Sequence, residues 1–260
     1  YLLRSLAIYE KVYGENHPAL IATLFWRGYM YKSQSKYKNS YLSYRQSLES
    51  FLYLIQRELA FIPTENRRFF LKGMEDSYAI PSHFFDFVFD KESESLTQLA
   101  FFLRINRHGL LEEIEKRQSQ LISLDDNQTN IVQELRGIIQ QLSLINLSND
   151  QRKKLVLRRD KLERKLYRLL PKLNPRIVEV NEVVKAIPHN GLLVEFQRYH
   201  PSENSKRVGL TPKWQKERYL AFVVNTNENI ETIDLGLAEP IEEKIKKALT
   251  ASEEGLADAQ

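Results

Sequence analysis

Apolar residues recur at helical spacing through the first two thirds of the chain, and this periodicity constrains the fold more than any other feature. Residues three or four positions apart lie on one face of a helix and form a continuous apolar stripe. Three such stripes follow residue 95: Leu96, Leu99, Ala100 and Leu103; Ile131, Leu135, Ile138 and Leu142; Leu155, Leu162, Leu166 and Leu169. The short links between these segments predict antiparallel helical hairpins.

After Pro188 the pattern changes from helical to β. Three segments rich in β-forming residues follow, at Leu192–Tyr199, Arg218–Asn225 and Ile230–Leu235. The second is apolar on both alternating faces, so we expect it to be the central strand of a covered sheet. A helix then opens at Pro240, and its apolar residues are expected to point inward: Ile241, Ile245, Ala248 and Leu249. The predicted fold class is mostly α, with a C-terminal partial α/β sheet of three strands.

Phenylalanine is concentrated between Gln56 and Asp90, where Pro81 is expected to separate two helices. The residues concerned are Phe69, Phe70, Phe84, Phe85, Phe87 and Phe89. We interpret them as core residues between packed helices, because large apolar side chains are usually buried. An exposed aromatic groove for a peptide is the alternative.

The N-terminal part contains a turn between two predicted helices, in the stretch Val12–Leu20, which reads VYGENHPAL. Gly14 suits the end of a helix and Pro18 suits the first turn of the next. Helices are therefore expected at Tyr1–Tyr13, at Pro18–Ser33 and from Tyr37 onward. His17 has no second ligand at a suitable spacing, so this stretch predicts a turn and not a metal site.

The same region resembles the tetratricopeptide repeat (TPR) of the kinesin light chain type. The resemblance rests on the stretch Leu6–Pro18, on the Lys36-Tyr37 pair, and on the 42 residues that separate Leu6 from Leu48. It covers residues 1–55, little more than one repeat. It implies a protein partner that binds through TPR-like helices. The chain begins at Tyr1, so we expect it to be a piece of a longer protein whose upstream repeats complete the array.

The remainder resembles the front part of a CHAT domain, a caspase-like domain found downstream of such repeats in bacteria, including cyanobacteria. The matching stretches are Leu99–Glu112, Ile187–Phe196, Arg218–Val224 and Ile233–Gly236, followed by Pro240-Ile241. In the first, Arg107-His108-Gly109 stands where the family usually has a basic-Lys-Gly turn. These resemblances divide the chain into three parts. Residues 1–55 form a TPR-like repeat, residues 56–187 form the helical region of the CHAT domain, and residues 188–260 form the start of a truncated caspase-like core.

The CHAT resemblance implies a cysteine peptidase, in which a His acts as general base for a Cys nucleophile. The chain has no cysteine, and its five histidines do not match the family's catalytic position: His17, His83, His108, His189 and His200. We therefore assign no catalytic, cofactor-binding or metal-binding residue and expect the chain by itself to be inactive. The alternative is a non-enzymatic scaffold with a degenerate caspase-like part. Glu195 lies in an apolar strand and needs either an outward-facing position or a partner, for which Arg198 and Tyr219 are the candidates.

Positive charge is concentrated between Gln151 and Lys172, where ten Lys or Arg stand against Asp160 and Glu163. Such a segment can attract phosphates. We interpret it instead as a solvated face, or as one neutralised by Glu112, Glu113 and Glu115 of a neighbouring helix. A nucleic-acid-binding helical protein is the third functional hypothesis, and no nucleic-acid partner is expected. The chain contains no apolar run long enough for a membrane span, so we expect a cytoplasmic protein without a membrane partner.

Overall fold

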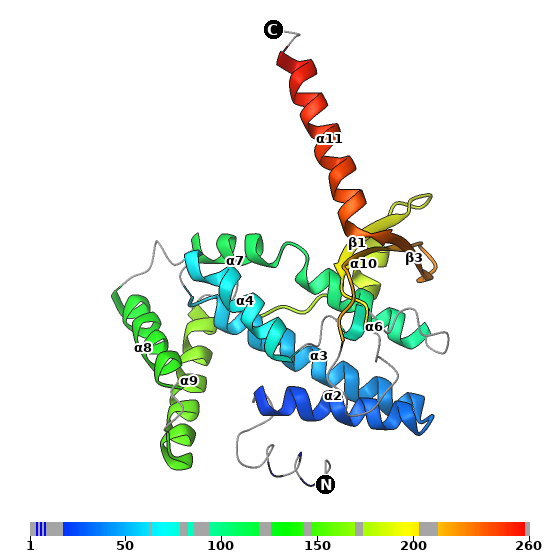
Figure 1. Cartoon of the computed structure of the whole chain (residues 1–260). Coiled ribbons are helices and arrows are strands. Elements are labelled where there is room, and N and C mark those ends of the chain that lie inside the picture. The colour runs from blue at the N-terminus through cyan, green and yellow to red at the C-terminus, as the bar shows by residue number, and fades with distance from the viewer. Residues whose placement is uncertain are drawn as a thin grey trace. The chain divides into compact units, whose positions relative to one another are not determined.

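The computed structural model describes residues 4, 6, 8, 18–62, 64–78, 83–85, 94–119, 126–142, 147–169, 174–202 and 213–257. The chain is mostly helical and carries one three-stranded antiparallel sheet near its C-terminus (Figure 1), as the periodicities predict. Within the described residues, no helix is both long and apolar enough to cross a membrane.

The chain forms two compact units, and each unit combines two separate stretches of sequence. Unit 1 consists of Tyr1–Tyr78 and Asn106–Ile177, and unit 2 of Ala79–Ile105 and Val178–Gln260. The three-part division of the chain that the sequence resemblances imply stays a prediction.

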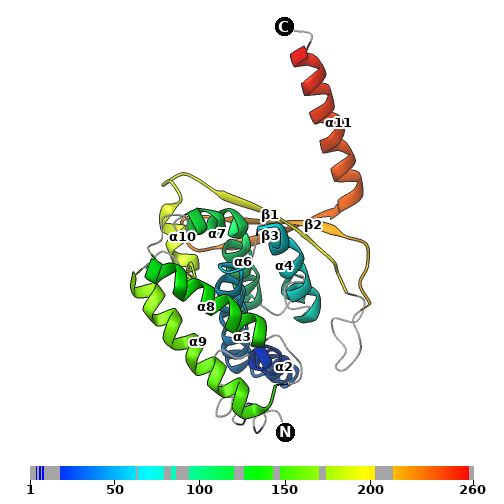
Figure 2. The same cartoon turned by 90° about the vertical axis from the view of Figure 1, so that its left-hand side faces the viewer.

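Unit 1 is helical. It contains α2 (Pro18–Ser33), α3 (Tyr37–Leu59), α4 (Thr64–Tyr78), α7 (Leu110–Ser119), α8 (Asp126–Leu142) and α9 (Asn149–Leu169). The first two begin where the sequence predicts and lie side by side as an antiparallel hairpin in both views (Figures 1 and 2). The turn between them places Ser35 in the left-handed region, with φ 57°. The predicted first helix, Tyr1–Tyr13, lies outside the described residues apart from residues 4, 6 and 8, which are helical.

A hydrophobic core joins the end of α3 to the α8–α9 hairpin. Its buried residues are Ala60, Phe61, Ile131, Val132, Leu135, Ile138, Leu162 and Leu166. The predicted stripes on α8 and α9 supply most of them. Gln56 of α3 adds a polar link, because its side chain both donates to the carbonyl oxygen of Arg176 (2.9 Å) and accepts from its backbone N–H (2.8 Å).

Unit 2 is built on the sheet. Its elements are most of α6 (Glu94–Arg107), α10 (Val180–Ala186), β1 (Leu193–Tyr199), β2 (Arg218–Val224), β3 (Ile230–Leu237) and α11 (Ala238–Ala257). The strand order is β1-β2-β3 with both pairs antiparallel, so the second strand is central, as predicted.

The two faces of the sheet differ in burial. On one face Phe222 is fully buried, and its ring centroid lies 5.6 Å from that of Phe101 and 6.4 Å from that of Phe85. On the other face Phe196 is 56% exposed and Ile233 is 48% exposed. The core of this unit therefore lies on the Phe222 side, and the expectation of a covered sheet is wrong for the other face.

Two sequence-based expectations about burial are wrong. Phe84 and Phe85 are buried as expected, but Phe69 on α4 is 82% exposed, and Phe87 and Phe89 lie outside the described residues. The apolar stripe of α11 does not point into a core. That helix leads away from the sheet in both views (Figures 1 and 2), and Ile245 and Leu249 are exposed. Helical periodicity predicts a stripe but does not determine what covers it.

Candidate functional site

The α2–α3 hairpin is held together by an unusually close contact between Gly28 and Tyr44. A Cβ atom on Gly28 would lie 2.6 Å from Cδ1 of the Tyr44 ring, which is fully buried. Two buried serines of α3 add hydrogen bonds between the helices: Ser40 donates to the carbonyl oxygen of Gly28 (2.8 Å) and Ser47 to that of Ile21 (2.7 Å). The hairpin is therefore a rigid platform, on which α2 can present side chains to solvent.

The solvent side of α2 carries large apolar side chains. Trp26 and Met30, one helical turn apart, are each 43% exposed. The Tyr29 ring packs edge-on against Trp26, with centroids 5.9 Å apart. Trp, Tyr and Met are the residue types that protein interfaces favour, and Met adapts to irregular partners. We call these three residues the α2 stripe.

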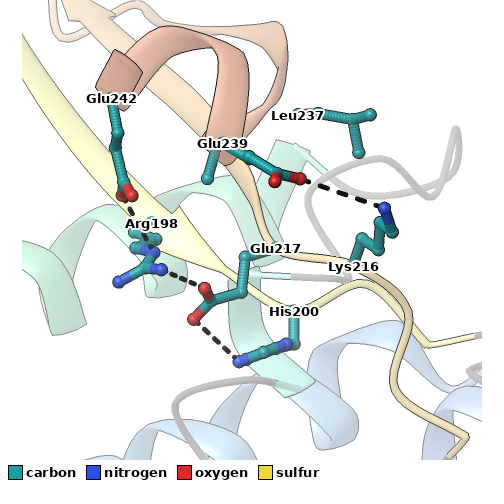
Figure 3. Close-up of a pocket in the computed structure, with 8 residues that line it drawn as sticks. Arg198, His200, Lys216, Glu217, Leu237, Glu239 and Glu242 are labelled. Atoms are coloured by element: carbon teal, nitrogen blue, oxygen red, sulfur yellow. Dashed lines mark hydrogen bonds and ion pairs between the residues drawn. The ribbon is translucent and has the colours of Figure 1, made fainter. Parts of the chain in front are cut away.

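A charged pocket of about 470 Å³ lies where the first turn of α11 meets the ends of β1 and β2 (Figure 3). Its charges are paired. Arg198 bonds Glu217 and lies 3.3 Å from Glu242, while Lys216 lies 3.9 Å from Glu239. Tyr219 donates a hydrogen bond to Glu242 (3.1 Å). Together these contacts attach the start of α11 to the sheet.

His200 is also in this pocket, and both of its ring nitrogens are engaged. Nε2 lies 3.0 Å from Glu217 and Nδ1 lies 3.2 Å from the carbonyl oxygen of Gln215 (Figure 3 shows the first contact). The eight lining residues include no hydroxyl or thiol. A His–carboxylate pair without an adjacent nucleophile does not make a covalent catalyst. The arrangement supports an ion-pair network that fixes α11.

The predicted partners of Glu195 are wrong. Its carboxylate pairs with Arg104 of α6, at 2.9 and 3.1 Å. The strand register explains the error. Arg198 lies three positions after Glu195 in β1, so its side chain projects from the other face of the sheet, and Tyr219 is paired directly with Arg198 and shares that face. Glu195 shares the Phe222 face and meets the helix that covers it.

The other described histidines belong to different segments of the chain. His83 is packed against Trp214, with ring centroids 5.3 Å apart, and burial lowers its pKa to about 4. His108 lies in the turn after α6, where Gly109 has φ +65°. His189 is exposed in a turn before β1, and His17 lies outside the described residues. Among the described residues, no three His, Asp or Glu side chains are grouped so that they can hold a metal ion.

A buried charged cluster in unit 1 escaped the sequence analysis. Glu163 of α9 is 4% exposed, and its Oε1 lies 3.7 Å from Nε of Arg57 and 3.9 Å from Nε of Arg159. Burial raises the pKa of Glu163 to about 7. The guanidinium groups of Arg57 and Arg159 lower the pKa, but the effect of burial is larger. The position of Glu163 directly beside Leu162 on the apolar stripe was the available signal for this burial.

No protein-family model, curated protein or solved structure matches the chain. The TPR and CHAT resemblances therefore stay predictions from the sequence.

Proposed function

We propose that this chain is a protein-interaction module in which the α2 stripe binds a partner protein. The observation that carries the proposal is the exposure of Trp26 and Met30 on a hairpin whose other side is tightly packed. A rigid platform with an exposed aromatic anchor binds at a low entropic cost, because little has to be ordered on binding. The TPR resemblance of residues 1–55 supports the same surface.

We further propose that residues 56–260 are the leading half of a CHAT caspase-like domain, in a cytoplasmic protein. The support is the order of the elements, three strands followed by a helix, which is the order that the resemblance implies. Because the chain has no cysteine, it does not supply the nucleophile of such a peptidase. The alternative is a scaffold protein whose caspase-like part is degenerate.

Selection from a displayed peptide library tests the interaction proposal. The whole chain is immobilised, the enriched peptides are synthesised, and their dissociation constants are measured for the wild type and for variants. We expect Trp26→Ala to weaken binding at least tenfold, as expected for a buried aromatic anchor. Phe69→Ala, which removes an exposed aromatic outside the hairpin, is the matched control and is expected to leave affinity unchanged. Equal losses in both variants would reject the α2 stripe as the binding surface.

The peptidase and scaffold alternatives differ in what accompanies this chain. Reading the gene onward from the codon for Gln260 is the direct test. A frame that continues with strands followed by a His and a Cys at strand ends supports a peptidase parent. A frame without that pair supports the scaffold.

A further inference from the structure

Seven of the cations of α9 lie on its solvent side: Lys153, Lys154, Arg158, Lys161, Arg164, Lys165 and Arg168. At 100° per residue they fall within an arc of about 140°. The opposite side of α9 holds the buried residues Leu162, Glu163 and Leu166. We call the seven cations the α9 basic face.

The α9 basic face carries a large net positive charge. Asp150, at the start of α9, lies on the same side, and Glu134 of α8 pairs with Arg158 through two contacts of 2.6 and 3.0 Å. Seven positive charges against these two negative charges leave a net charge of +5. The whole chain has a net charge of +4, so the rest of the molecule has a net charge of −1. The positive charge is thus segregated on one surface.

Most of these cations form no ion pair within the part of the chain that the structure describes. Lys153, Lys154, Lys161, Arg164 and Arg168 make no ion pair with any residue that the structure describes. Glu134 of α8 is an acidic partner on this side, through Arg158. From the sequence alone, neutralisation by Glu112, Glu113 and Glu115 is one expectation and a solvated face is the other. An unneutralised face of this density attracts a polyanion.

The geometry of the face suits a duplex. Along the helix axis, cations three or four residues apart follow one another from Lys154 through Arg158, Lys161 and Lys165 to Arg168, with about 5–6 Å between neighbours. From Lys154 to Arg168 the face is about 21 Å long, or roughly six base pairs at about 3.4 Å each. Arg164 and Lys165 lie about 100° apart around the axis. A helix of about 10–12 Å diameter fits a major groove about 12 Å wide, so the two edges of the face can reach phosphates on both strands.

Two other anionic partners fit less well. An amphipathic helix binds a membrane by inserting its apolar side, but the apolar stripe of α9 is occupied by the core shared with α8. An interface with a protein has a core depleted in Lys and enriched in aromatic residues, whereas this face has four lysines and no aromatic residue. The lack of aromatic residues also disfavours single strands, whose bases stack on aromatic rings.

We propose that the α9 basic face binds the phosphate backbone of double-stranded nucleic acid, without reading base sequence. Contacts from Lys and Arg to phosphates carry no sequence information directly, and no Asn or Gln of α9 lies among the seven cations to contact adenine. This surface is separate from the α2 stripe, so either proposal can fail without the other.

Fluorescence anisotropy of the whole chain with labelled 20-base-pair DNA and RNA duplexes of random sequence tests the proposal. We expect binding at 50 mM salt with little dependence on sequence. If about five phosphates are contacted, the logarithm of the binding constant should fall with the logarithm of salt concentration with a slope of about −4 to −5. Absence of binding to both duplexes at 50 mM salt would overturn the proposal. Stronger binding of one duplex identifies which nucleic acid supplies the phosphates.

A charge-matched pair of variants locates the surface. The triple variant Lys154→Glu, Lys161→Glu, Arg164→Glu reverses the α9 basic face, and the triple variant Lys244→Glu, Lys246→Glu, Lys247→Glu makes the same change of net charge on exposed α11. We expect the α9 variant to lose at least a hundredfold in affinity and the α11 variant to lose less than tenfold. Circular dichroism confirms that both are folded. Equal losses would mean that binding follows net charge alone and would overturn the proposal.

Competing anions decide the class of partner. Polyglutamate and vesicles containing phosphatidylserine are added at matched charge concentration to the duplex complex. We expect the duplex to remain bound. Displacement by polyglutamate would assign the face to an acidic protein, and displacement by vesicles would assign it to a membrane surface; either result overturns the proposal.

Discussion

Gly28 of α2 lies so close to Tyr44 of α3 that any side chain at position 28 would overlap the Tyr44 ring. The three nearest ring carbons are 2.6 to 2.8 Å from the position of a Cβ atom. The ring is fully buried. The separation of the two helices, and therefore the position of the α2 stripe, depends on this glycine.

Replacing Gly28 by Ala is expected to lower the free energy of unfolding by about 1–2 kcal/mol, because overpacking outweighs the gain in helix propensity. Gly137→Ala in α8 is the matched control, since no atom lies within 4 Å of its added Cβ. There the substitution is expected to stabilise the protein by about 0.5–1 kcal/mol. Urea unfolding followed by circular dichroism measures both. Stabilisation by both substitutions would show that the Gly28 contact is looser than described.

Glu163 should make the stability of unit 1 depend on pH. Its pKa in the folded protein is raised from 4.5 to about 7, so the folded state binds the proton more tightly than the unfolded state. The proton on Glu163 contributes its full stabilisation below about pH 4.5. As the pH rises through 7 this contribution is lost, and the free energy of unfolding falls by up to about 2–3 kcal/mol. Glu163→Gln is expected to remove this loss between pH 5 and 8. Glu134→Gln, at an exposed carboxylate, should retain it, and the same slope in all three proteins would contradict the assignment.

His83 should make the stability of unit 2 depend on pH in the opposite direction, so that acid destabilises it. Its pKa is lowered to about 4, so its contribution to stability is present above about pH 6.5 and is lost as the pH falls towards 4. The chain has two tryptophans, so Trp26→Phe leaves Trp214 as the only one and its fluorescence reports on the His83 contact. In that background we expect His83→Leu to make the Trp214 signal less sensitive to acid. His189→Ala, at an exposed histidine, serves as the control and should leave the acid transition unchanged.

The Arg104–Glu195 pair should couple α6 to β1. Both side chains are about four-fifths buried, so removing one partner leaves the other charge poorly solvated. A double-mutant cycle with Arg104→Met and Glu195→Gln is expected to give a coupling energy of about 1–2 kcal/mol. The exposed Arg158–Glu134 pair, treated in the same way, should give a smaller coupling. Additive effects of Arg104→Met and Glu195→Gln would show that the pair does not hold the helix to the sheet.

The elements of this fold are readable from the sequence where the signal is local. The helix at Pro18–Ser33 follows from its N-terminal proline, and Arg218–Val224 is a central strand because it is apolar on both faces. Such signals involve neighbours along the chain, which share a face or a turn.

The contacts that position the candidate sites are not local, and the sequence does not determine them. Arg104 is 91 residues from Glu195, and which residue meets that carboxylate depends on which helix covers the sheet. The exposure of Trp26 depends on what lies beside α2, and its neighbour Phe25, with similar chemistry, is buried. The α9 basic face is visible as composition, but which of its cations find an acidic partner emerges only from packing.

Hydrogen exchange of the whole chain, with and without a selected peptide, tests the central claim most directly. If the α2 stripe is the binding surface, added protection should concentrate in α2 and in the part of α3 that packs on it, and Trp26→Ala should abolish that protection. Protection confined to residues 180–257, or protection in α2 that persists in Trp26→Ala, would contradict the account.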